Sequence, residues 1–323
     1  WSFKIINSKT YDYDNEWQYI LKSLATKDIK SIKKIDKNYT KLLSKYVLDF
    51  IKEFSVTTID FVSSHGHTAL HDPSNALTYQ IGNLHELSNY LGLKVICDFR
   101  AQDVKLGGQG APLVPVGESY LFPEYNTLIN LGGFANITKK INDNLIAYDV
   151  CPLNIVFNQL SSLIELKYDD KGKIALSGKI NIELFNCLQS IEYYKLDPPK
   201  SLGVEWVNDN ISPIINKFSE VSVEDLLHTF SNHFARQIVD NIKSTDKVLI
   251  TGGGAYNDYL IQKIRDLTKS IIIIPDSEII EFKESLIFAF LGVLRNLNIN
   301  NCYSSVTGAI KDHSSGNIII PEI

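Results

Sequence analysis

Three glycine clusters, each following an apolar run, constrain how this chain folds. They are LGGQGAP at residues 106–112, INLGGFANIT at 129–138 and VLITGGGAYN at 248–257. The runs TLIN and KVLI before the last two predict buried strands, so these clusters are expected at strand carboxyl ends, where α/β sheets bind ligands. Glycine allows positive φ and lets backbone N–H groups approach an anion, so the clusters indicate either phosphate-binding turns or plain tight turns.

The composition predicts a soluble globular protein large enough for two domains, with 323 residues of which 44% are hydrophobic. The net charge is −5 and the lysines are scattered, so we expect no nucleic-acid partner. No apolar run approaches the ~20 residues that span a bilayer, and no signal peptide is recognisable, which predicts a cytoplasmic protein without membrane segments. The four cysteines have no CxxC spacing and are interpreted as reduced thiols rather than zinc ligands or disulfides: Cys97, Cys151, Cys187 and Cys302.

Apolar periodicity predicts alternating helices and strands, with a domain boundary near residues 120–126. Residues 1–14 alternate like a sheet-edge strand, and the histidine-rich string SSHGHTALHDP at 63–73 is expected to be a turn. The predicted strands are 59–63, 94–97, 127–130, 144–149, 248–250 and 271–274. The predicted helices are 16–54 (as two or three helices), 84–91, 154–166, 223–242, 259–267 and 283–297.

Several longer motifs carry a family resemblance. They are SSHGHT at 63–68, CDFRAQDVKLGGQGAPLVP at 97–115, INLGGFANIT at 129–138, AYDVCPLN at 147–154, PPKSLGVEW at 198–206, TGGGAYN at 251–257 and SSVTGA at 304–309. Together they resemble the anhydro-N-acetylmuramic acid kinases of the sugar kinase, Hsp70 and actin superfamily. The resemblance implies an α/β protein with two RNase H-like (actin/hexokinase-type) lobes and an interlobe active-site cleft. We expect an N-terminal lobe at 1–122 and a C-terminal lobe at 123–323. In an alternative arrangement, the C-terminal segment returns to the first lobe.

The family also has an N-terminal glycine- and serine-rich phosphate loop of the approximate pattern G-T-S-x-D-G. Nothing like it occurs in this sequence, which contains no Met and opens at Trp1. We therefore expect the first strands of the N-terminal lobe to be missing from this chain. Two hypotheses follow: an active kinase, or a non-catalytic sugar- or nucleotide-sensing protein of the same fold. A chaperone-like or scaffold ATPase is a third, carried by fold analogy alone.

The resemblance implies a specific activity in peptidoglycan recycling. Family members convert 1,6-anhydro-N-acetylmuramic acid plus water to N-acetylmuramic acid 6-phosphate with ATP and Mg²⁺. The expected partner is thus the small-molecule sugar, and the expected assembly is a homodimer. Such chemistry needs a carboxylate base at a strand end.

Asp149 is predicted to be that base. It ends the apolar stretch 145–148 and precedes Val150, Cys151 and Pro152, matching the position of the family's catalytic aspartate. The alternative is that Asp149 caps the helix that begins at Asn154.

The glycine clusters supply the predicted nucleotide-binding residues. Gly132, Gly133 and Asn136 resemble the second phosphate-binding turn of the superfamily, and the TGGGAYN cluster resembles its adenosine-binding turn. The complete predicted cofactor-binding set is Gly107, Gly108, Gly110, Gly132, Gly133, Asn136, Gly252, Gly253, Gly254 and Asn257.

Sugar-binding candidates come mainly from the first half of the chain. Arg100 is expected to hold the lactyl carboxylate or to orient a catalytic acid. The alternatives are a hydrogen-bonded core histidine for His65, a structural pair for Asp98 and Arg100, and a dipole role for Glu284 in a first helical turn. The predicted substrate-binding set is His65, Asp98, Arg100, Gln109, Pro112 and Glu284. Lys200 and Glu205 are weaker candidates for a sugar-site lining or a hinge.

The spacing of His65, His67 and His71 also resembles a zinc site. Position 67 is usually glutamine in the resembling family, and glutamine is not a standard zinc ligand. We therefore expect no metal bound by the protein alone, and Mg²⁺ to arrive with ATP.

Overall fold

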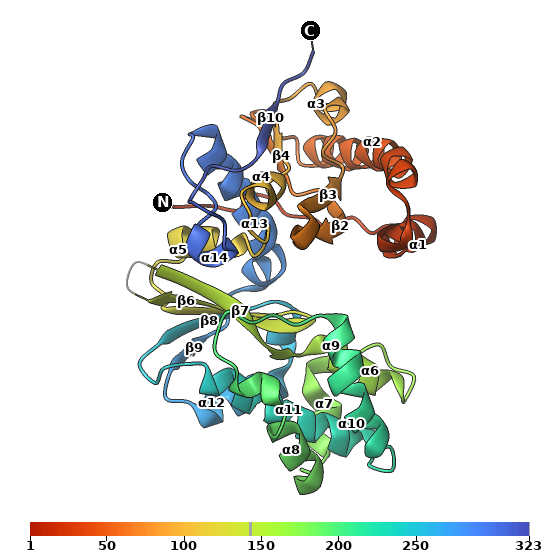
Figure 1. The fold of residues 1–323 in the computed structure, drawn as a ribbon, viewed down its shortest axis with the longest axis vertical. Coiled ribbons are helices and arrows are strands. Elements are labelled where there is room, and N and C mark those ends of the chain that lie inside the picture. The colour runs from red at the N-terminus through yellow and green to blue at the C-terminus, as the bar shows by residue number, and fades with distance from the viewer. Residues whose placement is uncertain (142–143, 323) are drawn as a thin grey trace. The chain divides into compact units, whose positions relative to one another are not determined.

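The computed structural model describes residues 1–141 and 144–322. The chain forms two compact units (Figure 1). Unit 1 consists of Trp1–Leu121 together with Glu284–Ile323, and unit 2 consists of Phe122–Lys283. Each unit combines helices with a β-sheet, so the predicted α/β class is confirmed.

Unit 2 is built on a five-stranded sheet of order β7-β6-β5-β8-β9. Strands β5 (Thr127–Leu131), β6 (Phe134–Ile141) and β7 (Asn144–Pro152) form an antiparallel meander. Strands β8 (Lys247–Thr251) and β9 (Ile271–Ile273) continue the sheet parallel to β5. This is the strand order of an RNase H-like domain. It places the carboxyl ends of β5 and β8, and hence two of the glycine clusters, side by side.

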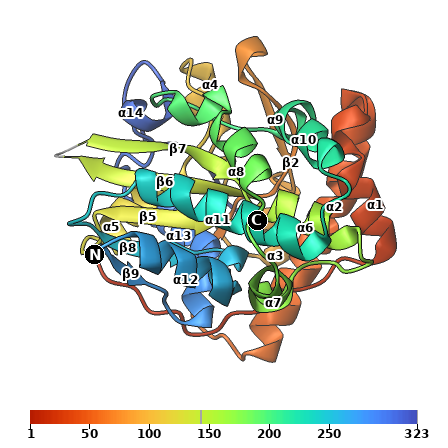
Figure 2. The ribbon, with the colours of Figure 1, turned by 90° about the horizontal axis from the view of Figure 1, so that it is seen from below.

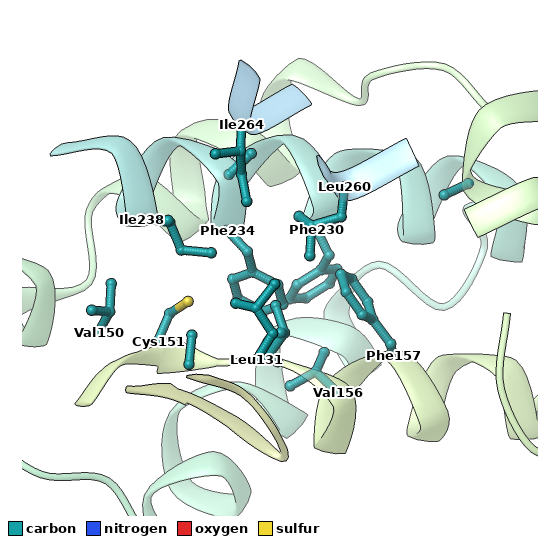
Figure 3. Packing of buried hydrophobic residues seen from close by; sticks show 14 of the residues in the cluster. Leu131, Val150, Cys151, Val156, Phe157, Phe230, Phe234, Ile238, Leu260 and Ile264 are labelled. Atoms are coloured by element: carbon teal, nitrogen blue, oxygen red, sulfur yellow. The ribbon is translucent and has the colours of Figure 1, made fainter. Parts of the chain in front are cut away.

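Helices α11 and α12 lie across one face of this sheet (Figure 2). Helix α11 begins after Ser222, whose side chain accepts a hydrogen bond from the Asp225 N–H. Its Phe230 and Phe234 are fully buried and point toward Leu131 of the sheet (Figure 3). The helices of unit 2, 3₁₀ turns included, are α6 (Asn154–Ser162), η3 (Asp170–Gly172), α7 (Lys173–Ser177), α8 (Ile182–Gln189), η4 (Glu192–Lys195), α9 (Val204–Asn210), α10 (Ser212–Lys217), α11 (Val223–Asp240), η5 (Gly253–Tyr256) and α12 (Asp258–Leu267).

Unit 1 has a three-stranded sheet of order β1-β4-β10 and a separate β2-β3 hairpin. Its strands are β1 (Val62–Ser64), β2 (His67–Asp72), β3 (Leu77–Ile81), β4 (Val95–Cys97) and β10 (Asn317–Ile319). Its helices are α1 (Asn15–Lys22), η1 (Leu24–Thr26), α2 (Ile29–Glu53), η2 (Pro73–Asn75), α3 (Glu86–Leu91), α4 (Ala101–Lys105), α5 (Val114–Leu121) and α14 (Ser304–Thr307). Helix α13 (Ser277–Asn296) begins in unit 2 and enters unit 1 at Glu284. The C-terminal segment thus supplies β10, which pairs antiparallel with β4.

Two sequence predictions were wrong in unit 1. Residues 1–14 form no strand, because their backbone pairs with no other strand. Side-chain contacts hold the segment instead: Lys9 pairs with Glu53, and the ring of Tyr11 stacks on Tyr46. Most of the histidine-rich string forms strand β2 rather than a turn, because residues 67–72 pair antiparallel with β3, with an irregularity between Thr68 and Leu70. Helix α13 also begins earlier than predicted, at Ser277.

No helix within the described part of the chain is both long enough and apolar enough to cross a membrane.

Candidate functional site

Asp149 lies on β7 of unit 2, where four groups surround it. Its Oδ1 accepts a hydrogen bond from Asn136 Nδ2 at 2.8 Å, and its Oδ2 accepts from the Leu202 backbone N–H at 2.8 Å. The Asp149 carbonyl accepts from the Tyr193 hydroxyl at 2.7 Å, and its N–H donates to the Lys200 carbonyl at 3.2 Å. The residue is only partly buried. The carboxylate is therefore held in one orientation by a hydrogen bond at each oxygen.

A bulge sets the geometry between Asn136 and Asp149. Ala135 pairs with Cys151 and Asn136 pairs with Asp149, so Val150 is an extra residue in β7. Asn136 is itself oriented, because its Oδ1 accepts a hydrogen bond from Asn130 Nδ2 at 3.3 Å. An amide–amide–carboxylate chain therefore leads from β5 through β6 to β7. Bulges of this kind re-aim side chains next to functional sites.

The helix-cap alternative for Asp149 is wrong. Helix α6 has Leu153 at its N-cap position and no side-chain cap hydrogen bond. The first turn of α6 instead meets the glycine turn, since the N–H groups of Leu153 and Ile155 donate to the Gly133 carbonyl. The Asp149 carboxylate therefore does not cap α6.

Sequence reasoning missed two groups that hold Asp149, Tyr193 and the Leu202 N–H. Both come from a segment far along the chain; the motif at 198–206 contains Leu202, and no motif contained Tyr193. Lys200, a weaker candidate, lies in this segment. Its ammonium sits 4.8 Å from the centre of the Tyr193 ring and 3.3 Å from the Tyr193 carbonyl, and burial lowers the pKa of Lys200. Glu205 is exposed on α9.

Gly132 and Gly133 form the β5-β6 turn, and they differ in surroundings. The Gly132 N–H donates to the Phe134 carbonyl at 3.1 Å, so that amide is used within the turn. A Cβ at Gly133 would meet no atom within 4 Å. Gly133 is therefore the member of the pair that leaves open space for a ligand.

The third cluster follows β8 and contacts the same turn. Gly252 has φ +82°, and a Cβ there would lie 2.7 Å from Asn130 Oδ1. A Cβ at Gly254 would lie 2.7 Å from Leu131 Cβ. Asn257 caps α12, accepting from the Leu260 N–H at 2.9 Å. Packing thus accounts for Gly252, Gly254 and Asn257, whereas a Cβ at Gly253 would meet its nearest neighbour at 3.9 Å, in ordinary contact.

In unit 1 the structure brings His65 and Arg100 together. Arg100 Nε donates to His65 Nε2 at 2.9 Å, and His65 Nδ1 lies 2.9 Å from the Gly66 carbonyl. A carbonyl oxygen only accepts and Nε–H only donates, so the proton of the neutral ring is on Nδ1. Burial, and then the charge of Arg100, lowers the pKa of His65 to about 4. His65 is therefore a neutral acceptor that orients Arg100.

The LGGQGAP loop lies beside Arg100 in unit 1. Arg100 Nη1 donates to the Gly110 carbonyl at 2.6 Å, and the Gln109 N–H donates to the Thr307 carbonyl at 2.8 Å. A Cβ at Gly108 would overlap the Asp103 carboxylate, whereas Gly107, at φ +79°, faces open space. The side chains of Gln109 and Pro112 are exposed. The loop thus groups with His65 and Arg100, the predicted sugar-binding residues.

Asp98 and Glu284 also belong to unit 1. Asp98 has φ +59°, its Oδ2 accepts from Asn317 Nδ2 at 2.9 Å, and burial raises its pKa. Among the described residues, Arg100 bonds to His65 and Gly110, and Asp98 bonds to Asn317. The alternative of a structural pair between Asp98 and Arg100 is therefore wrong for the described contacts. Glu284 is exposed and lies about two turns inside α13, so the first-turn dipole explanation does not apply to it. Its charge favours the ionised form of Arg100, although burial lowers the pKa of Arg100 overall.

The three histidines of the HGHTALH string do not form a metal cluster. In the described residues, a single group of three such donors converges, and it contains none of them. His65 Nε2 already accepts from Arg100, and His71 Nδ1 lies 3.0 Å from the Thr78 hydroxyl.

The predicted residues therefore fall into two sets, one in each unit. Unit 2 carries Asp149, Asn136 and the turns at 132–133 and 252–254, and unit 1 carries His65, Asp98, Arg100, Glu284 and the loop at 107–112. The first set places a carboxylate on the same sheet as two glycine turns, and the second places a guanidinium beside a glycine-rich loop.

Comparison with known proteins identifies the family. Residues 7–321 match the family model for anhydro-N-acetylmuramic acid kinase. The chain is 32% identical to the "Anhydro-N-acetylmuramic acid kinase" of Bacillus cereus over 97% of this chain and 88% of the relative. It is 36% identical to that of Clostridioides difficile over 82% of this chain and 76% of the relative.

A solved structure also resembles the chain, the activator of 2-hydroxyisocaproyl-CoA dehydratase from Clostridium difficile with bound ADPNP. It has 19% identity and a TM-score of 0.38 over 57% of this chain and 67% of that one, a likeness too weak to support an argument. The sequence matches carry the assignment: the chain belongs to the anhydro-N-acetylmuramic acid kinase family.

Proposed function

We propose that the chain converts 1,6-anhydro-N-acetylmuramic acid, ATP and water to N-acetylmuramic acid 6-phosphate and ADP, as a step of peptidoglycan recycling. The observation that carries this proposal is the fixed carboxylate of Asp149, held at both oxygens beside a glycine turn in a chain of this family. A homodimeric assembly and a cytoplasmic location stay predictions of the family resemblance.

In the proposed reaction Asp149 takes a proton from water. The water oxygen attacks C1 of the sugar, the C1–O6 bond breaks, and O6 forms a bond to the γ-phosphorus as ADP leaves. Asn136 and the Leu202 N–H fix the carboxylate, so little reorientation is needed when the proton moves.

The residues of unit 2 fit a metal-bound nucleotide. Gly133 presents open space at a strand's carboxyl end, and the nearby polar side chains are oxygen donors: Asn130, Asn136 and Asp149. Oxygen ligands are those that Mg²⁺ prefers, and it is bound mainly by substrate phosphates plus one or two carboxylates. When bound with ATP, Mg²⁺ would neutralise charge on the phosphates.

Arg100 is the proposed partner of the lactyl carboxylate. Its Nε and Nη1 are engaged by His65 and Gly110, which fixes the guanidinium plane. We assign Nη2 to the substrate, because an oriented guanidinium binds carboxylates more selectively than a lysine ammonium does.

A coupled assay with ATP, Mg²⁺ and the anhydro sugar tests the function. We expect sugar-dependent ADP release and a product with phosphate on O6. Asp149→Asn should retain the fold and lose about 10²- to 10⁴-fold in kcat, the usual contribution of a general base. Sugar binding by calorimetry without ADP release would instead identify a non-catalytic binding protein and overturn the proposal.

A further inference from the structure

Three buried side chains of unit 1 bring unlike donor atoms together. They are Asp103 on α4, Cys302 in the loop after α13, and His313 after α14. An Asp103 oxygen, Cys302 Sγ and a His313 ring nitrogen all lie within 4.8 Å of one another. Within residues 1–141 and 144–322, no other group of three such side chains converges in this way. None of the three is among the residues assigned to sugar or nucleotide.

The contacts of His313 leave one ring nitrogen facing a carboxylate without a hydrogen bond. Nδ1 lies 3.1 Å from the Lys311 carbonyl, which only accepts hydrogen bonds, so Nδ1 carries a proton. Nε2 faces Asp103 Oδ1 at 3.6 Å, and among the described atoms it has no hydrogen-bond partner. The side chains of His313 and Asp103 are only 4% and 0% exposed. In a neutral ring, Nε2 and the carboxylate would be two acceptors facing each other away from water. This arrangement is unfavourable unless Nε2 gains a proton or a metal cation lies between them.

The surrounding contacts orient the donors as they do around bound metals. Thr307 Oγ1 donates to Asp103 Oδ1 at 2.7 Å, and the Gly110 N–H donates to Oδ2 at 2.7 Å. Cys302 and His313 are paired across a β-bridge, exchanging backbone hydrogen bonds at 3.1 and 3.0 Å. A histidine that donates one ring N–H to a backbone carbonyl presents its other nitrogen as a metal ligand.

We propose that Asp103, Cys302 and His313 bind one divalent transition-metal ion, with Zn²⁺ as the ion that this donor set selects. A thiolate, an imidazole nitrogen and a carboxylate oxygen are its usual ligands, and a water completes four-coordination. On binding, the Cys302 thiol releases its proton to solvent and the sulfur's electron pair forms the bond to the metal.

The proposed ion has a structural role that is independent of the proposed kinase reaction. It would join α4 to the segment at 302–313. Because Asp103 also holds the Gly110 N–H, and Gly110 in turn accepts from Arg100, the ion would support the loop beside Arg100.

The test uses the untagged full chain, stripped with a chelator and titrated with Co²⁺. We expect one equivalent to bind with a thiolate-to-cobalt charge-transfer band in the near ultraviolet, and added Zn²⁺ to displace it. Zn²⁺ should also raise the melting temperature of the stripped protein. Cys302→Ser should lose the band and His313→Asn should weaken binding at least about tenfold. The matched controls, Cys187→Ser and His85→Asn, should bind like the parent chain.

If the variants fail to fold, X-ray absorption on the zinc-loaded parent chain still decides, because the proposal requires one sulfur and one imidazole ligand. The proposal is overturned if the parent chain binds no stoichiometric metal, or binds it without sulfur. The competing outcome is a buried ion pair between His313 and Asp103. Histidine ¹⁵N NMR of the metal-free chain would then show protons on both ring nitrogens of His313, and Zn²⁺ would not change the melting temperature.

Discussion

Asn136 donates its side-chain N–H to Oδ1 of Asp149 at 2.8 Å, across a bulge that makes the two residues direct partners on β6 and β7. The bond is charge-assisted and orients the carboxylate of a residue that is only partly buried. The proposed base therefore depends on a neighbouring amide for its geometry.

Replacing Asn136 should lower turnover more than stability. Asn136→Ala removes a hydrogen bond to a charged group, worth about 1.5–3 kcal/mol, so kcat should fall roughly 10- to 100-fold. Steady-state kinetics at saturating ATP and sugar measures the effect. Asn232→Ala is the control. Asn232 Nδ2 donates to the His228 carbonyl on α11 and to the Tyr259 hydroxyl on α12, and it has no contact with Asp149 in the described hydrogen bonds. The kcat of this variant should therefore match that of the parent chain. Equal kcat values for both variants would remove Asn136 from its positioning role.

Two adjacent tyrosines should respond oppositely to loss of the hydroxyl. Tyr193→Phe removes the bond to the Asp149 carbonyl and should lower the free energy of unfolding by about 1 kcal/mol. Tyr194→Phe should be neutral or stabilising, because the buried Tyr194 hydroxyl has no partner among the described residues. Urea denaturation of both variants measures the difference. A larger loss for Tyr194→Phe than for Tyr193→Phe would contradict the hydrogen-bond assignment.

Open space at Gly133 predicts a substitution that separates binding from folding. Gly133→Ala should leave stability within about 0.5 kcal/mol of the parent, because the new Cβ meets no atom within 4 Å. If the turn binds the nucleotide phosphates, its KM for ATP should rise about tenfold or more. Gly254→Ala is the contrasting variant, since its Cβ would lie 2.7 Å from Leu131 Cβ, and it should destabilise unit 2 by about 1–3 kcal/mol. An unchanged KM in Gly133→Ala would argue that the turn is only structural.

The imidazole of His65 should titrate near pH 4. Because its pKa in the folded chain is lowered from 6.5, the unfolded chain binds more protons between about pH 6.5 and about pH 4. The contribution of His65 to the free energy of unfolding is thus fully present above pH 6.5 and is lost as the pH falls toward 4. Histidine ¹⁵N NMR should show a neutral ring protonated on Nδ1 at pH 7. The His65 resonance is assigned by its absence from the spectrum of His65→Gln. A titration midpoint near pH 6.5 would show that the ring is not buried against Arg100.

Arg100 should discriminate sugars by their lactyl carboxylate. Arg100→Gln should raise KM for the anhydro sugar by about 10- to 100-fold, as expected when a charged hydrogen bond of about 1.5–3 kcal/mol is lost. An anhydro aminosugar without the lactyl group should bind both proteins equally weakly. Competition kinetics with the two sugars provides the readout. A parallel loss of affinity for both sugars would indicate that Arg100 holds the loop rather than the carboxylate.

The sequence by itself determined the α/β class, the long helices, several strands and the family, because these depend on local periodicity and on motifs that are contiguous in the chain. It missed strands β2, β3, β6 and β10 and most of the short helices. The apolar runs before the second and third glycine clusters are β5 and β8, whereas the first cluster follows helix α4 rather than a strand. The helices at 223–242 and 259–267 are α11 and α12 with boundaries shifted by at most two residues. Asp149 could be selected from its neighbours in the motif at 147–154 and from the family resemblance. Its predicted place at the end of a strand was wrong, because β7 continues to Pro152.

Only the tertiary structure decided which groups surround those residues. The Leu202 N–H and Tyr193 reach Asp149 from more than 40 positions away, and the bulge at Val150 sets its register against Asn136. Asp103, Cys302 and His313 show the same limit, since about 200 residues separate Asp103 from the other two and no CxxC spacing marks them. The order of apolar and polar residues along a chain indicates local conformation. Contacts between distant segments depend instead on how strands pair and helices pack.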